Sequence, residues 1–451
     1  MPLSVAELQP TLHDLFTDTA RDLARLTDFS QRERLLTGPA FAQALVFCLL
    51  HDPDSTLDDF ADFASRHLGV RVTPNAFDER FGKAAARFLL ALFLEAFKRR
   101  LASARPGLLP LLRRFEGVYL RDATTVPLPA RLAELFPGRV GRAGGPAAAL
   151  KLVLEVEVGS GQFAEASVLP GTANDRSAAT AAKGLPKGAL LLEDMGFLAG
   201  DRLQDYVDQG VYVLTRVPAW TAFFERKGTG YRRLDLLKWL RGLEGNGGQR
   251  EVYVFHGQKV RLRLLAVRVP PEVARQRRER VRREARERGR PVSQKKLDLC
   301  EWAVLATNAP EGLIGVREAF EVRRVRWQVE LVFELFKSEG GVGRTRSGKP
   351  WRVLAELFAK LPAMVVQQWV LLAAGYAMLR HSARRAARRV RRAAGYVLEA
   401  LGGEQALARE VALLAAVLRR HCRVASRRKE PSTLDRLAAL DPDFKTLGKV
   451  A

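Results

Sequence analysis

The sequence predicts an α/β protein with a mixed β-sheet core, a β-rich insertion and helical regions at both ends. Three observations lead to this prediction. Apolar stripes at helical spacing fill residues 1–107, and short apolar runs alternate with helical patterns over 108–218. Helical patterns return after Gly341, whereas residues 219–312 break the alternation, as an insertion would.

The composition limits the class of protein. A chain of 451 residues that is 47% hydrophobic can bury more than one core. Its formal net charge of +24 and isoelectric point of about 10.6 favour a polyanionic partner, either nucleic acid or an anionic membrane surface. The plain alternative is a soluble basic protein without such a partner.

Cysteine and histidine usage argues against several kinds of site. The three cysteines, Cys48, Cys300 and Cys422, are far apart and odd in number. They form no disulfide framework or zinc spacing, which fits a reducing cytoplasm. The six histidines do not cluster with them, so a zinc site or a Cys/His catalytic site is not expected.

The N-terminal region has a weak DNA-binding pattern. The stretches "FAQALVFCLL" and "AARFLLALFLEAFKRRL" predict apolar helices. Between them, "VTPNAFDERFGKA" predicts a turn and a further helix that begins at "TPN". A helix-turn-helix unit in a basic protein would suit DNA, but for this segment alone ordinary helical packing is the better explanation.

The core begins near residue 115. The runs "GVYLRD", "LKLVLEVEV" and "QFAEASVLPG" predict strands, the last two joined as a hairpin through Gly159, Ser160 and Gly161. A small-residue helix over 175–185, the strand "GALLLED", the helix "AGDRLQDYVDQG" and the strand "VYVLTRVP" complete the order. This order predicts a mixed sheet.

The insertion and the C-terminal region follow. A hairpin is predicted at "REVYVFHGQKVRLRLLAVRVP", then a charged helix at "PEVARQRRERVRREARERGR", which would be either a solvated arm or one lying on nucleic acid. The strand "EWAVLATNAP" is expected to return to the main sheet. The apolar stretch 361–379 approaches membrane-span length, but Pro362 and paired glutamines favour a buried helix.

The stretch "RRVRWQVELVFELFKSEGG" mixes acids with basic residues. On a regular helix Arg323, Arg326, Glu330 and Lys337 share one face, Glu334 lies nearby, and valines and phenylalanines lie opposite. Surface ion pairs would give a similar stripe. A divalent cation would also relieve the repulsion between the two glutamates, provided that other acids supplied oxygen ligands.

Asp122 and Asp194 are candidates for those ligands. Each stands at the expected end of a strand, followed by small turn residues, where α/β sites gather. The alternative is that each aspartate is only a cap or turn residue. Three acids from separate segments can hold two Mg²⁺ ions about 4 Å apart around a phosphodiester.

These motifs resemble transposases of the IS4 group of DDE enzymes over about residues 30–380. "RDATTVPLP" resembles the first aspartate motif, and "LLEDMGF" the second. Arg326, Glu330 and Lys337 match the third, a Tyr-x2-Arg-x3-Glu-x6-Lys signature, whose tyrosine position holds Arg323. "LPGTANDRS" resembles a further landmark in which Asp175 would be structural.

The resemblance implies an RNase H-like catalytic core. Asp122, Asp194 and Glu330 would bind Mg²⁺, with Mn²⁺ as a substitute, and Arg323, Arg326 and Lys337 would contact DNA. The implied segments are an N-terminal helical DNA-binding region (1–107), the first part of the core (108–218), the β-rich insertion (219–312), the second part (313–350) and a basic helical region (351–451).

The implied activity is metal-dependent cleavage of double-stranded DNA at element ends, followed by strand transfer into target DNA. A homodimer in the DNA complex, no membrane partner and a bacterial, nucleoid-associated cytoplasmic location are expected with it. A domesticated or inactive transposase that only binds DNA is the first alternative, favoured by Arg323 in place of tyrosine. A basic RNA-binding or ribosome-associated protein is the second.

Overall fold

The computed structural model describes residues 3–30, 35–99, 101, 109–139, 147–174, 183–197, 200–217, 221–256, 258–424 and 431–440. The chain forms two compact units, each assembled from three segments. The first unit comprises Met1–Leu108, Asp122–Asn174 and Trp327–Ser432; the second comprises Leu109–Arg121, Asp175–Arg326 and Thr433–Ala451. The five sequence segments stay a prediction about domains.

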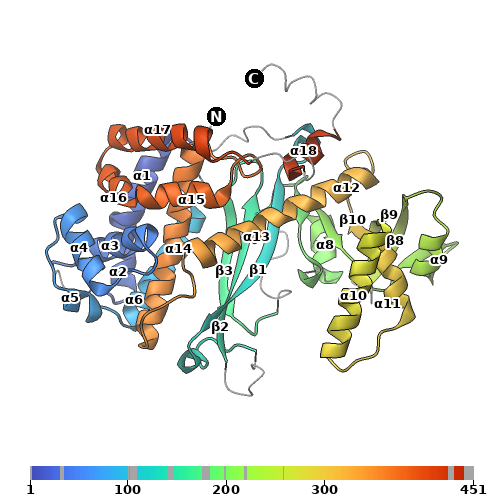
Figure 1. Cartoon of the computed structure of the whole chain (residues 1–451), viewed down its shortest axis with the longest axis horizontal. Coiled ribbons are helices and arrows are strands. Elements are labelled where there is room, and N and C mark those ends of the chain that lie inside the picture. Colours follow the sequence, from blue (N-terminus) through green and yellow to red (C-terminus); the bar gives the residue numbers. More distant parts are fainter. Residues whose placement is uncertain are drawn as a thin grey trace. The chain divides into compact units, whose positions relative to one another are not determined.

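Helices from both ends of the chain build the first unit (Figure 1). The N-terminal set is α1 (Val5–Phe16), α2 (Asp18–Leu26), α3 (Gly38–His51), α4 (Leu57–Leu68), α5 (Pro74–Asp78) and α6 (Lys83–Lys98). The C-terminal set is α14 (Pro350–Ala373), α15 (Ala383–Arg392), α16 (Ala394–Glu399) and α17 (Glu404–His421). The helices predicted at both ends are therefore present, and α5 starts at "TPN" with Thr73 as its cap.

Helix α14 is the centre of this unit. It packs against α3 and α6, and it is buried from Val353 to Ala373 around its whole circumference. Pro362 lies inside it, and Gln368 donates to the carbonyl of Gly161 in the β2–β3 turn at 2.6 Å. The prediction of a buried helix is confirmed, and no helix in the described ranges is long and apolar enough to cross a membrane.

The strands form one mixed sheet in the order β3-β2-β1-β4-β5-β10-β9-β8-β6-β7. The core strands are β1 (Val118–Leu128), β2 (Ala148–Glu157), β3 (Phe163–Pro170), β4 (Leu190–Leu192), β5 (Tyr212–Arg216) and β10 (Trp302–Thr307). Strand β1 contributes to both units, because its first residues pair in parallel with β4 in the second unit and the rest belongs to the first. The β2–β3 hairpin and the return of β10 beside β5 are as predicted.

Two details of the strands differ from the prediction. Strand β1 does not end at Asp122 but continues to Leu128, because the β-branched residues Thr124, Thr125 and Val126 favour extended backbone. Strand β2 alternates polar and apolar residues, yet every position is buried. Both faces of β2 are therefore covered. The predicted helix over 175–185 falls almost wholly outside the described residues.

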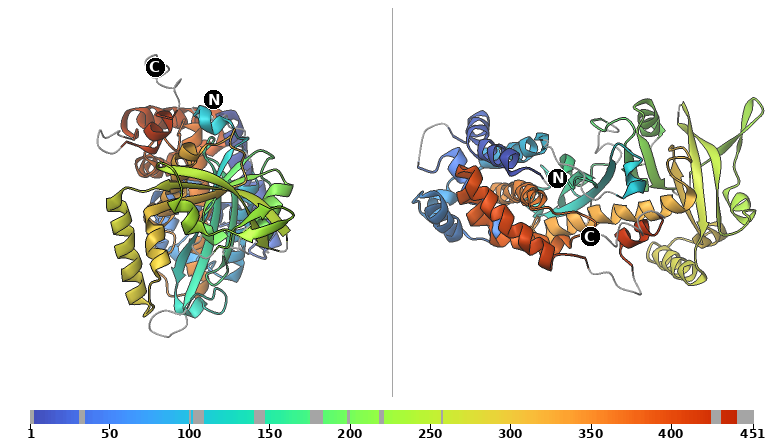
Figure 2. Two further views of the ribbon diagram at one scale, coloured as in Figure 1. Left: turned by 90° about the vertical axis from the view of Figure 1, so that its right-hand side faces the viewer. Right: turned by 90° about the horizontal axis from the view of Figure 1, so that it is seen from above.

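The second unit contains the insertion. Strands β6 (Phe224–Lys227), β7 (Gly230–Arg233), β8 (Gly247–His256) and β9 (Gln258–Arg268) extend the sheet, and β8 and β9 form the predicted antiparallel hairpin (Figure 2). Its helices are α7 (Pro110–Arg113), α8 (Gly200–Asp208), α9 (Leu236–Arg241), α10 (Pro271–Glu287), α11 (Gln294–Asp298), α12 (Val316–Val322) and α18 (Thr433–Ala438). The predicted charged helix is α10.

Candidate active site

A pocket of the first unit collects acidic side chains beside a lysine. Its lining residues are Asp122, Ala123, Thr124, Glu330, Phe333, Glu334, Lys337 and Ser338. The first three come from β1, and the others from α13 (Trp327–Glu334) and the turn after it. The structure thus brings together three of the predicted site residues, Asp122, Glu330 and Lys337, although they are up to 215 positions apart in the sequence (337 − 122).

The segment that carries Glu330 is not one regular helix. It begins as a 3₁₀ turn (Arg323–Arg326), continues as α13 and ends as a π-helical turn (Leu335–Glu339). Its apolar face is buried as predicted, and the ring of Phe336 packs edge-on against Phe163 of β3 at 5.9 Å. The π turn is wider than an α turn, and Lys337 within it still lines the pocket.

The side chain of Lys337 is exposed as a whole, but the surrounding protein removes part of the water around its ammonium group. This partial burial lowers the pKa of Lys337. A less strongly hydrated cation next to carboxylates is suited to receive a phosphate oxygen. The pocket therefore combines oxygen ligands for a hard cation with a donor for a polyanion.

The remaining predicted site residues belong to the second unit. Asp194 follows β4, and its carboxylate accepts a hydrogen bond from the guanidinium of Arg323 at 3.4 Å. The Arg323 side chain is only 9% exposed. The prediction that Arg323 lies on the same polar stripe as Glu330 and Lys337 is therefore wrong, because its guanidinium is buried against Asp194.

The residues that precede the two aspartates form a buried ion pair with each other. Arg121 precedes Asp122 and Glu193 precedes Asp194; their side chains are 1% and 0% exposed and lie 3.6 Å apart. Tyr206 of α8 donates to Glu193 at 2.9 Å. Burial raises the pKa of Glu193, and the charge of Arg121 opposes this rise. The pair therefore links β1, at the residue before Asp122, to the residue between β4 and Asp194.

The donors of the pocket fit a divalent cation by their chemistry. Asp122 and Glu330 offer carboxylate oxygens, which Mg²⁺, Mn²⁺ and Ca²⁺ all prefer over sulfur or imidazole. Across the described ranges, no three His, Cys, Asp or Glu side chains lie close enough together to hold a metal ion. The acids therefore line the pocket without converging on one point.

A buried glutamate anchors the π-helical turn. Glu339 is 5% exposed, and its carboxylate accepts hydrogen bonds from three arginines of α15: Arg384 at 2.7 Å, Arg388 at 3.1 Å and Arg391 at 3.2 Å. Burial alone would raise the pKa of Glu339, but hydrogen bonds from Arg388 and Arg384 lower it overall. Three cations thus hold the turn that carries Lys337.

A buried lysine supports the loop after this turn. Lys360 of α14 is 2% exposed and donates to the carbonyls of Gly341 at 3.2 Å and Arg344 at 2.8 Å. Gly341 has φ of +59°, and a side chain there would also collide with Pro53. Burial lowers the pKa of Lys360 to about 8. These contacts hold the backbone that follows the π-helical turn.

Sequence patterns did not identify these supporting residues. "RD" and "ED" are visible at both aspartates, and alternation along a strand would have placed Arg121 and Glu193 inside. Glu339 and its arginines carry no such signal, because 45 to 52 residues separate them. The crowding of arginines in "SARRAARRVRR" is the one signal that could have pointed to a buried counter-charge, but no prediction was based on it.

Residues 113–366 match the family model described as "Transposase DDE domain". The match covers more than half of the chain and includes both aspartates, Glu330 and Lys337.

Curated relatives include insertion-sequence transposases. The chain is 24% identical over 363 residues to the transposase for insertion sequence element IS231B from Bacillus thuringiensis subsp. berliner, covering 76% of this chain and 75% of the relative. It is 21% identical to that of IS1151 from Clostridium perfringens, covering 77% of each. A solved piggyBac transposase synaptic complex with hairpin DNA is 10% identical, with a TM-score of 0.47, over 90% of this chain and 84% of that one.

Replacing Glu339 with glutamine should loosen α15. Three guanidinium groups would lose their shared anion, and the free energy of opening of α15 should fall by about 1.5–3 kcal/mol. Because the pKa of Glu339 is depressed, this stabilisation exists above its unfolded pKa and is lost as the pH falls below about 4.5. Hydrogen exchange of the α15 amides at neutral pH measures the change.

The matched control is Glu95→Gln, which removes an exposed ion pair with Lys98. It should leave exchange in α15 unchanged. Equal protection of α15 in the wild type and Glu339→Gln would show that the arginines do not depend on this carboxylate.

Lys360→Met should change how stability depends on pH. Between about pH 8 and 10.5 only the unfolded lysine binds its proton, so the free energy of unfolding rises with pH in the wild type. The difference of about 2.5 pKa units (10.5 − 8) corresponds to a rise of about 3 kcal/mol. Urea denaturation at several pH values should show the rise in the wild type and its loss in Lys360→Met.

Lys349→Met serves as the control, because Lys349 is an exposed lysine at the start of the same helix. It should keep the wild-type rise. If the free energy of unfolding of Lys360→Met also rises with pH, the rise does not come from the proton of Lys360.

Proposed function

The chain belongs to the DDE transposase family, and we propose that it is the transposase of an insertion sequence, which binds the element's ends and moves them by a cut-and-paste route. Membership of this family implies the enzyme class and the use of a divalent metal ion. The proposed steps are hydrolysis of a phosphodiester at the element's end and transfer of the freed 3′-hydroxyl to target DNA. The observation that carries this proposal is the pocket shared by Asp122, Glu330 and Lys337.

The proposed catalytic residues are Asp122, Asp194 and Glu330. Their carboxylates would hold Mg²⁺, with Mn²⁺ as a substitute. When bound, the metal would lower the pKa of the attacking oxygen and neutralise charge on the phosphodiester. Asp194 is included in this proposal because "LLEDMGF" resembles the second aspartate motif of the family.

The basic residues of the same segment have separate proposed tasks. Lys337 would bind a phosphate oxygen next to the cut bond, and the half-buried Arg326 would hold the adjoining backbone. Arg323 was expected from the sequence to contact DNA as well. Since its guanidinium is buried against Asp194, we assign it the task of holding that carboxylate in place.

The partners follow from this chemistry. Double-stranded DNA, first the element's ends and then the target, is the proposed substrate. A homodimer would bring two ends together, and access to the nucleoid in a bacterial cytoplasm would bring the enzyme to its DNA. Three free cysteines, all buried, are compatible with a reducing compartment.

Glu330→Gln should abolish cleavage of DNA that carries the element's ends. An amide keeps the shape of the side chain but cannot serve as an anionic ligand, and a loss of at least about 100-fold is expected. Nicking of a plasmid with the DNA that flanks the coding region, in the presence of Mg²⁺, measures it.

Glu334→Gln is the matched control, since Glu334 lines the same pocket one turn later. It should keep most of the wild-type cleavage. Equal loss in both variants, or none in Glu330→Gln, would refute the assignment of the ligand to Glu330.

Lys337→Ala should weaken cleavage and DNA binding together. The loss of one phosphate contact should flatten the slope of log affinity against log salt concentration by about 0.9. Lys337→Arg should recover much of the binding, because it keeps the charge. An unchanged slope in Lys337→Ala would show that Lys337 does not meet phosphate.

A further inference from the structure

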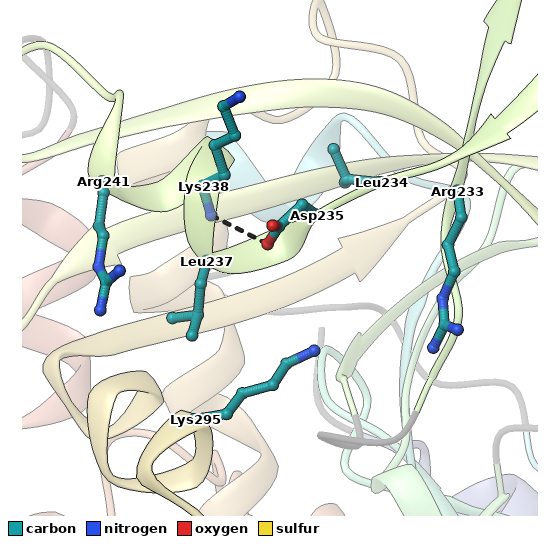
Figure 3. A pocket seen from close by; sticks show the side chains of 7 residues that line it. All are labelled: Arg233, Leu234, Asp235, Leu237, Lys238, Arg241 and Lys295. Atoms are coloured by element: carbon teal, nitrogen blue, oxygen red, sulfur yellow. Dashed lines mark hydrogen bonds between the residues drawn. The ribbon is translucent and has the colours of Figure 1, made fainter.

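Two adjoining hollows in the insertion are rich in positive charge. The first is lined by Arg233, Leu234, Asp235, Leu237, Lys238, Arg241 and Lys295 (Figure 3). The second shares several of these residues and adds Glu225, Arg232, Trp239, Gly242 and Arg250. Six of these residues are cations and two are acids. All of them belong to the second unit, whereas the pocket of Glu330 belongs to the first.

The acids around the hollows already have partners. The Asp235 carboxylate accepts the backbone N–H of Lys238 at the start of α9, as the dashed line in Figure 3 shows. Glu225 binds Arg250 at 2.5 Å and Arg232 at 3.8 Å. Asp298, beside the first hollow, pairs with Arg241 at 2.9 Å.

Three cations have no such partner. Arg233 of β7, Lys238 of α9 and Lys295 of α11 are exposed, and none of them pairs with a carboxylate of the described chain. In Figure 3 the Lys238 ammonium extends away from that of Lys295, so the positive charges are spread over a surface. A surface of this kind suits an extended anion better than a small one.

The apolar residues of the lining limit the kind of ligand that the two hollows can bind. Leu234 and Trp239 are buried, so the hollows present no free aromatic face on which a base could stack. Contacts would therefore be made with phosphates, independently of sequence. Arginines in another arginine-rich part of the chain already have an anionic partner. Three arginines of α15 donate hydrogen bonds to Glu339.

We propose that Arg233, Lys238 and Lys295 form a docking site for the phosphate backbone of double-stranded DNA. This inference rests on the proposed transposase function and adds to it a second DNA contact, carried by the insertion. The contact strengthens binding of DNA without choosing its sequence, so it serves element ends and target alike.

The test compares two triple variants of the full chain. Arg233→Ala/Lys238→Ala/Lys295→Ala removes the proposed contacts. Arg261→Ala/Arg268→Ala/Arg280→Ala removes the same charge from the same unit, but each of these arginines is already paired with a glutamate. Both are made in a Glu330→Gln background, so that DNA is not cut during the measurement.

Affinity for a 30-base-pair DNA duplex is measured against salt concentration. The first variant should bind at least about tenfold more weakly at 0.1 M salt, with a slope flatter by about 2–3, because three phosphate contacts are lost. The control should change the slope by less than about 1. Equal slopes in the two variants would overturn the proposal. Lys295→Glu is a second variant with a single exposed change, and it should also flatten the slope.

Two further arms separate the possible sources of failure. A variant that loses affinity for an RNA duplex of the same length but not for DNA overturns the assignment to DNA. Mg²⁺-dependent nicking by the wild type is measured separately. If the wild type nicks DNA but the triple variant keeps the slope of its parent, only the docking site is refuted. If the triple variant has a flatter slope but the wild type never nicks DNA, the proposed function is refuted and the docking site stands.

Discussion

The attachment of one carboxylate, Glu339, to three arginines is the constraint on which the candidate site depends. A buried carboxylate without cations would be costly, so the sequence must return helix α15 to the turn that carries Lys337. Lys360 and the tight fit of Gly341 then determine the path of the chain beyond it. The π-helical turn after α13 is therefore fixed by charge at Glu339 and by the packing of Phe336 against Phe163.

This constraint changes the interpretation of the net charge of +24. The excess is not one uniform DNA-binding surface. Part of it is internal: α15 uses three arginines on Glu339, and in α10 Arg277 and Arg278 bind the carbonyls of Trp302 and Leu297. Another part has no anion within the described chain, as around Arg233 and Lys295. Arginine-rich sequence alone does not distinguish these uses, because both need the same residues.

The sequence predicted the fold well where a local pattern was sufficient. Turn residues Gly159 and Gly161 marked the β2–β3 hairpin, and the valine and phenylalanine face of α13 was correctly predicted to be buried. Helical spacing selected Glu330 and Lys337, and Asp122 was chosen from its expected place at the end of a strand; the three meet in one pocket, although the strand runs on to Leu128. The burial of Arg323 was missed, because its partner Asp194 is 129 residues away in the sequence and no periodic pattern indicates that pairing. The contacts of Glu339 and Lys360 depend on tertiary packing, which has no periodic signal.

The first unit draws its pieces from distant parts of the chain, and this has a consequence during synthesis. Asp122 leaves the ribosome long before Glu330, and the last arginine that holds Glu339 is Arg391. A nascent or truncated chain that stops before this point has both acids but lacks part of their support. The pocket is therefore complete only when most of the polypeptide has been made. Full support of the turn that carries Lys337 is therefore tied to synthesis of the C-terminal helix α15.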